Sequence, residues 1–117
     1  MKYMLLIYLD ELEWENLSPA EKDAAMERGD RICKELTAAG QFLGGAPLES
    51  VATATTVREK DGKKVLTDGP FAETREQLGG YCLIDVKNLD EALDVAKRMQ
   101  STAVTSIEVR PLAAIAQ

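Results

Sequence analysis

The chain has 117 residues, of which 45% are hydrophobic, and a formal net charge of −6. This length predicts a single domain over residues 1–117. The negative charge argues against a nucleic-acid partner and against an electrostatic hold on anionic membranes, because both need a basic face. The sequence contains no histidine, which removes zinc, facial-triad iron and Ser-His-Asp sites, so we expect no metal and no cofactor.

The first expected element is a buried strand over residues 3–9, an unbroken run of apolar, branched and aromatic side chains. This run is too short to span a bilayer, and no small-residue cleavage site follows it, so we expect a cytoplasmic protein without a signal peptide. A helix is expected over residues 18–39. Ser18 can cap it, Pro19 suits its first turn, and Glu21 completes a capping box.

The middle of the chain is typical of a hairpin. Residues 42–48 form a short extended piece that glycine and proline interrupt, whereas residues 51–59 have the composition of a strand. The Asp61-Gly62 dipeptide then indicates a two-residue turn, with residues 63–67 as the returning strand.

The last third predicts a strand, a helix and a strand. Residues 81–86 are mostly apolar, Asn88 can cap the helix, and residues 106–110 alternate between apolar and polar side chains. Cys33 falls within the helix expected over residues 18–39 and Cys82 within the strand expected over residues 81–86, so we interpret them as reduced core residues rather than a disulfide or redox pair. The order β–α–(β hairpin)–β–α–β is the ferredoxin-like α+β pattern, in which two helices cover one face of an antiparallel sheet.

Two of the expected strands, residues 3–9 and 81–86, are apolar on both faces, yet two helices can cover only one face of the sheet. The alternating sets in the first strand are Met4, Leu6 and Tyr8 on one face, and Tyr3, Leu5 and Ile7 on the other. Because a soluble monomer rarely exposes so large an apolar face, we predict a homodimer with two sheets packed together. The alternative is a monomer whose second face is covered by residues 42–60.

Several segments carry a family likeness. The most specific runs from Asp68-Gly69-Pro70-Phe71 to Tyr81, and the others are residues 1–7, 89–92 and 106–111. Together they resemble the DGPF branch of the YCII-related proteins over nearly the whole chain. The resemblance implies a ferredoxin-like fold assembled as a dimeric α+β barrel. It implies little about chemistry: most members lack an assigned function, a few relatives are lyases such as a dehydrochlorinase of aromatic-compound breakdown, and some are encoded beside extracytoplasmic-function sigma factors.

The chain lacks the histidines that are found in many members of this family. The YCII branch resembles a His-Asp enzyme, and many DGPF members carry a His-Gly-like element before the last strand, where this chain has Ala103-Val104-Thr105. Histidine-based catalysis therefore cannot be carried over.

Asp68 is the candidate general base, because it lies on a turn that leads into a loop with further ionisable residues. Glu76 in that loop is a second candidate catalytic residue, and Arg75 beside it is a candidate for binding. The alternative is a purely structural turn, in which Asp68 bonds nearby amides and Phe71 anchors the loop.

Three further residues are binding candidates. Tyr81 offers a hydroxyl group, while Glu108 and Arg110 share one side of the last strand and should project away from the helices. This charged pair either lines a small polar cavity or forms a structural ion pair.

Two functions follow from these residues. The preferred one is a small-molecule-binding or regulatory homodimer, since the chain lacks histidine and any cluster that would hold a metal. The alternative is a dehydrochlorinase-like lyase or isomerase, with Asp68 as the base and Arg75 or Arg110 holding a small anionic substrate. Whether the chain is an enzyme stays open at this point; the expected partners are a second copy and a small anionic ligand.

Overall fold

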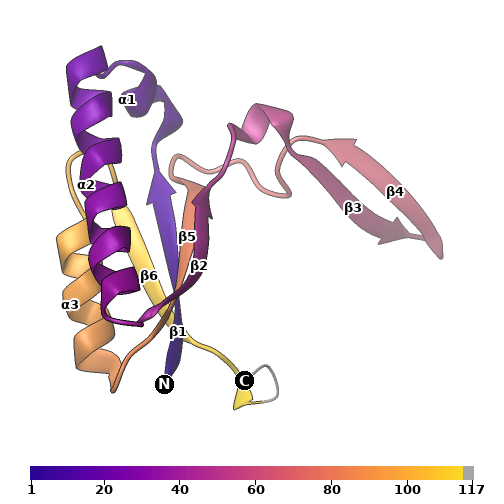
Figure 1. Ribbon diagram of the computed structural model, residues 1–117. Coiled ribbons are helices and arrows are strands. Elements are labelled where there is room, and N and C mark those ends of the chain that lie inside the picture. The colour runs from indigo at the N-terminus through magenta and orange to yellow at the C-terminus, as the bar shows by residue number, and fades with distance from the viewer. Residues whose placement is uncertain (115–117) are drawn as a thin grey trace.

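The computed structural model describes residues 1–114, which form an antiparallel four-stranded sheet of order β2-β5-β1-β6 with helices on one face (Figure 1). The elements of this body are β1 (Lys2–Leu9), α1 (Glu11–Glu15), α2 (Pro19–Ala38), β2 (Phe42–Pro47), β5 (Gln77–Asp85), α3 (Leu89–Met99) and β6 (Ser106–Pro111). Apart from the short α1, this body has the order βαββαβ, so the expected α+β fold with an antiparallel sheet is confirmed.

The helices α2 and α3 begin at the caps that the sequence indicates. Ser18 Oγ accepts a hydrogen bond from the Glu21 amide over 3.1 Å, and the Glu21 carboxylate accepts one from the Ser18 amide over 2.9 Å. Asn88 caps α3 by accepting from the Glu91 amide over 3.0 Å. No helix within residues 1–114 combines the length and the apolar character needed to cross a membrane.

The hydrophobic core lies between the sheet and the helices α2 and α3. One face of the sheet and the inner sides of both helices supply its buried side chains. These are Tyr3, Leu5, Cys82, Ile84, Val86, Ile32, Leu36, Ala92, Val95, Ala96 and Met99. Both cysteines are free thiols in or beside this core.

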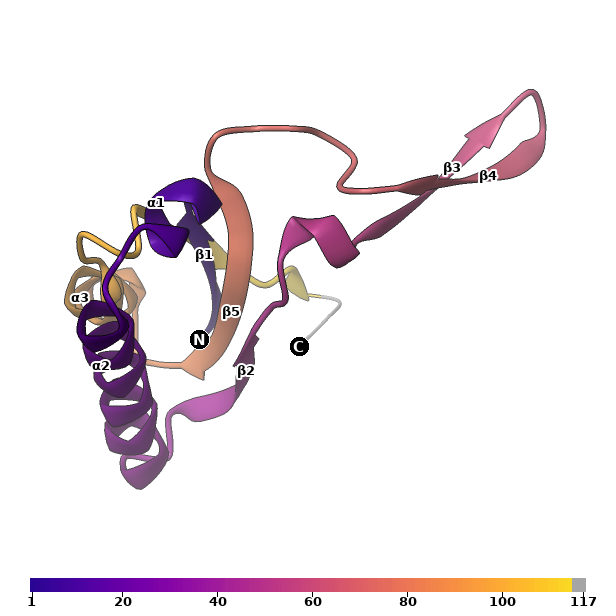
Figure 2. The same cartoon turned by 90° about the horizontal axis from the view of Figure 1, so that it is seen from above.

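The other face of the sheet, which we call the open face, carries no helix (Figure 2). The strand register places Met4, Leu6 and Tyr8 of β1 on it, and Leu6 lies between Tyr81 on β5 and Glu108 on β6. Met4 and Leu6 are only half-buried, although both lie on a central strand. The alternative in which residues 42–60 cover this face is not what the structure shows.

The hairpin predicted over residues 51–67 forms, but it does not join the main sheet. Its strands β3 (Thr55–Lys60) and β4 (Lys63–Asp68) make a separate two-stranded sheet that projects from the body, and we call residues 55–68 the arm (Figures 1 and 2). A 3-10 turn at Val51–Thr53 leads into it. At its tip Asp61 and Gly62 have φ angles of 52° and 77°, as a tight hairpin turn requires.

The strand that takes the expected hairpin's place in the main sheet is β2, at the edge. The sequence predicts residues 42–48 as a short extended piece that glycine and proline interrupt, but a Cβ atom on Gly45 would lie 2.6 Å from the Tyr81 carbonyl oxygen. Glycine therefore permits the close pairing of β2 with β5 rather than breaking it. β5 also starts earlier than predicted, at Gln77, because it continues through Gly79 and Gly80.

Candidate functional site

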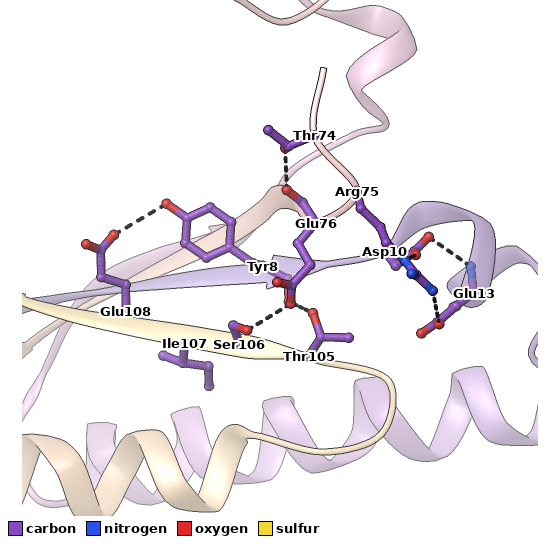
Figure 3. Close-up of a pocket in the computed structure, with 10 residues that line it drawn as sticks. All are labelled: Tyr8, Asp10, Glu13, Thr74, Arg75, Glu76, Thr105, Ser106, Ile107 and Glu108. Atoms are coloured by element: carbon purple, nitrogen blue, oxygen red, sulfur yellow. Dashed lines mark hydrogen bonds and ion pairs between the residues drawn. The ribbon is translucent and has the colours of Figure 1, made fainter. Parts of the chain in front are cut away.

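An open pocket of about 760 Å³ lies at one end of the sheet, where β1 leads into α1 and the loop that ends at Thr105 enters β6 (Figure 3). The loop before β5 supplies its remaining wall. The lining residues are Tyr8, Asp10, Glu13, Thr74, Arg75, Glu76, Thr105, Ser106, Ile107 and Glu108.

Asp10 is the most enclosed charged residue of this pocket, with 8% of its surface exposed. Its Oδ1 atom caps α1 by accepting from the amides of Leu12 over 3.0 Å and Glu13 over 3.3 Å. Its Oδ2 atom accepts from Arg75 Nε over 3.0 Å. The hydrogen bond from Arg75 is the main cause that lowers the pKa of Asp10, and the bond from the Glu13 amide adds to it.

Arg75 ties the loop before β5 to the start of α1. Besides Asp10, its guanidinium contacts Glu13 Oε1 over 3.5 Å, while its side chain stays 81% exposed. The hydrogen bond to Asp10 is the main cause that raises the pKa of Arg75. Arg75, which the sequence suggests as a binding residue for an anionic ligand, thus already forms ion pairs with Asp10 and Glu13 of the same chain.

Glu76 is held by hydroxyl groups from the start of β6. Its Oε1 atom accepts from Ser106 Oγ over 2.8 Å, and the Thr105 hydroxyl also bonds the carboxylate (Figure 3). These bonds, that of Thr105 first, lower the pKa of Glu76. Glu76 is therefore an ionised hydrogen-bond acceptor at neutral pH, placed to meet a donor that enters the pocket.

The pocket continues onto the open face through Tyr8 and Glu108. The Tyr8 hydroxyl donates to Glu108 Oε1 over 3.4 Å. With four carboxylates and one guanidinium in its lining, the pocket has a formal charge of −3.

The structure brings three of the predicted site residues together and leaves three apart. Arg75, Glu76 and Glu108 all line the pocket. Tyr81 and Arg110 lie on the open face, where the register places them opposite Leu6 and Met4. Within residues 1–114 there is no ion pair between Glu108 and Arg110.

Asp68 lies outside the pocket lining. It is exposed at the end of β4, opposite Thr55 at the base of the arm. Phe71 is 77% exposed, so the expectation that this ring anchors the loop within its own chain is wrong. Instead, the loop is held from the arm, since Arg58 donates to the Phe71 carbonyl oxygen over 2.6 Å and Thr56 to that of Gly69 over 2.8 Å.

Sequence reasoning missed Asp10, Tyr8 and the hydroxyls of Thr105 and Ser106. Asp10 followed by Glu13 at capping-box spacing could have indicated a helix start after the first strand. Among the described residues, no three side chains of the metal-binding types His, Cys, Asp or Glu are placed to hold one metal ion.

Two comparisons with known proteins find similar sequences. The family model described as the YCII-related domain matches residues 1–115. The chain is also 39% identical, over 115 residues, to an uncharacterized protein of Rhizobium meliloti (strain 1021). That alignment covers 97% of this chain and 93% of the relative.

Proposed function

Because the chain belongs to the YCII-related domain family, we propose that it is a cytoplasmic homodimer that binds a small molecule or serves a regulatory role. In this proposal two open faces pack together as a dimeric α+β barrel, with a ligand pocket at the end of each sheet. The observation that carries the proposal is the half-buried apolar face of the central strand β1, which runs directly into the pocket at Tyr8.

The open face supports the homodimer. Met4 and Leu6 of β1 have large apolar side chains, and their neighbours Leu83 and Tyr81 on β5 are also apolar or aromatic. In the single chain these side chains keep part of their surface in water, with Tyr81 38% exposed. A second copy that stacked on the same face would remove that surface from water, which favours association.

The pocket supports binding rather than proton transfer. A general base works best with a pKa near the working pH, but the bonds around Asp10 and Glu76 lower the pKa of each carboxyl group. Both groups are anions with fixed partners. They are suited to accept hydrogen bonds from a ligand and poorly suited to take a proton from one.

The formal charge of −3 on the lining favours a ligand that carries hydrogen-bond donors, such as an amine or a polyol. The small anionic ligand expected from the sequence would have to be held elsewhere. Arg110 on the open face remains the candidate for that role, and such a ligand stays a prediction.

A matched set of four-carbon probes tests the proposed ligand class. 1,4-Diaminobutane, 1,4-butanediol and succinate would be titrated into the wild type and followed by amide chemical shifts. We expect the diamine to bind most tightly with shifts at Asp10 and Glu76, and Glu76→Gln to weaken it about tenfold, since a charge-assisted bond is lost. Glu73→Gln, on the same loop but outside the lining, is the control. Tighter binding of succinate, or no effect of Glu76→Gln, would contradict the proposal.

The alternative function, a dehydrochlorinase-like lyase or isomerase with Asp68 as the base, stays a prediction. Its basis is the family resemblance, whereas the geometry places Asp68 exposed and outside the pocket. Measuring the turnover of chlorinated cyclic substrates by the wild type and by Asp68→Asn tests whether the protein is such an enzyme. Turnover by the wild type that Asp68→Asn abolishes at unchanged stability would replace the binding function with catalysis.

A further inference from the structure

The arm, residues 55–68, is poorly supported by its own chain. Within residues 1–114, β3 and β4 pack against each other and make only weak contacts with other strands and helices. The radius of gyration is 16.0 Å, whereas a compact chain of this length has about 13 Å. An isolated two-stranded hairpin is marginally stable in water. We therefore expect the arm to pack against a surface outside its own chain.

One face of the arm carries an apolar pair. Val57 and Leu66 are directly opposite each other in the hairpin register, and they are 62% and 71% exposed. Next to them on the same face, Glu59 and Lys64 form an ion pair over 3.3 Å. Phe71, just beyond the base of the arm, adds a third exposed apolar side chain. The opposite face instead bonds its own loop through Arg58 and Thr56.

The direction of the arm limits what can cover this pair. In both views the helices lie on one side of the sheet, and the arm extends on the opposite side, which is the side of the open face (Figures 1 and 2). Any molecule stacked on the open face therefore lies beside the arm.

The charges of the arm complement the rest of the chain. The arm holds four cationic and three anionic side chains, a net of +1, and its tip, residues 58–64, has a net of +2 because Asp68 lies at the base. Since the whole chain has a net charge of −6, the chain outside this tip has −8. A second copy of this chain thus offers the basic tip an acidic surface, besides an apolar face on the side toward which the arm extends.

From these observations we propose that the arm clasps a second copy of this chain, with Val57 and Leu66 packed against the partner and the basic tip on its acidic surface. The inference rests on the homodimer proposed above and extends it. The sheet faces supply one contact, and each arm adds a second that closes around the other subunit.

The arm can be removed without opening the chain. The Gly69 amide donates to the Ala54 carbonyl oxygen over 2.7 Å. With only two residues between Ala54 and Gly69, this same bond would close a four-residue β-turn. Replacing residues 55–68 by Asn-Gly therefore closes the base with a two-residue loop. A milder variant, Val57→Thr with Leu66→Thr, removes the apolar surface and keeps residues that favour strands. Met26→Gln, at an apolar side chain on α2 that is 62% exposed, is the control.

Sedimentation equilibrium would give the dimer dissociation constant of each protein, with circular dichroism to verify folding. We expect the double variant to raise this constant about tenfold or more, because both arms of the dimer lose apolar contacts. The shortened chain should raise it further, and the control should match the wild type.

The outcomes separate the two proposals. A wild type that is monomeric throughout the micromolar range would overturn the homodimer and the arm's role together. A wild-type dimer whose dissociation constant is unchanged in the double variant and in the shortened chain would overturn the arm's role alone and leave the packing of the sheets standing.

Discussion

Asp10 and Arg75 are 65 residues apart in the chain, yet Arg75 Nε donates to Asp10 Oδ2 over 3.0 Å. The bond joins the end of the first strand to the loop that precedes β5. It fixes one wall of the pocket against another, so the shape of the site depends on a contact that only the complete fold creates.

Two substitutions of Asp10 separate its contribution as the cap of α1 from its ion pair with Arg75. Asparagine still accepts the bonds of Leu12 and Glu13 that start α1, whereas alanine loses them together with the bond to Arg75. We expect Asp10→Ala to lower the free energy of unfolding more than Asp10→Asn. Urea denaturation at pH 7 measures both. Equal losses would mean that the cap contributes nothing.

The same carboxyl group predicts a dependence on pH. Its pKa in the folded protein lies below the ordinary value of 3.8, so its stabilising contribution is present above that value and disappears as the pH falls further. The difference in unfolding free energy between wild type and Asp10→Asn should therefore shrink as the pH is lowered from 5 through about 4 to 2. A difference that stays constant over this range would rule out the ion pair as its source.

Leu6 tests the packing of the sheets. A lysine at this central position of the open face would place a charge in the proposed interface, so Leu6→Lys should raise the dimer dissociation constant about a hundredfold or more. Leu12→Lys, at a side chain that is 78% exposed on α1, is the matched control. Light scattering after gel filtration gives the masses, and a fully dimeric Leu6→Lys protein would exclude the open face from the interface.

Adjacent glycines of β2 offer a second matched pair. A methyl group on Gly45 would meet the Tyr81 carbonyl oxygen at 2.6 Å, whereas one on Gly44 meets nothing within 4 Å. Gly45→Ala should cost about 1–3 kcal/mol of stability, while Gly44→Ala should change it by under about 1 kcal/mol. Chemical denaturation measures both, and equal effects would show that β2 shifts to accommodate the methyl group.

The cysteine thiols should react slowly. Burial is the main cause that raises the pKa of Cys82 to about 12, and it also raises that of Cys33. Both thiols are therefore protonated at pH 8, and the thiolate is the reactive form. A colorimetric thiol reagent should label the native protein far more slowly than the protein in guanidinium chloride, with Cys33, the more exposed of the two, reacting first. Rapid labelling of native Cys82 would contradict this burial.

Features that depend on neighbouring residues could be predicted from the sequence. The capping box at Ser18 and Glu21 and the turn at Asp61-Gly62 both form where expected. The alternation of the first strand also separated its two faces, and the structure shows which one is buried: Tyr3 and Leu5 are buried, whereas Met4 and Leu6 are half-buried. In each case the physical cause acts within a few residues of chain.

What could not be predicted depends on distant partners. Glycine at position 45 looks like a strand breaker until the backbone of Tyr81 is known to lie beside it. Glu76 was recognised as a candidate, but Thr105 and Ser106, whose hydroxyls lower its pKa, lie about 30 residues further along the chain. Likewise, the residues of the arm have ordinary strand composition, and nothing in them shows that the hairpin stands apart from the sheet.

The central position of β1 has a consequence for the order of folding. This strand is synthesised before the other strands of the sheet, and its two neighbours, β5 and β6, come from residues 77–111. Long-range pairing of this kind is slow, because a large loop must close before the contacts form. The apolar strand β1 therefore stays unpaired until residues 77–111 have been synthesised. During that interval its unpaired apolar side chains and backbone are open to aggregation.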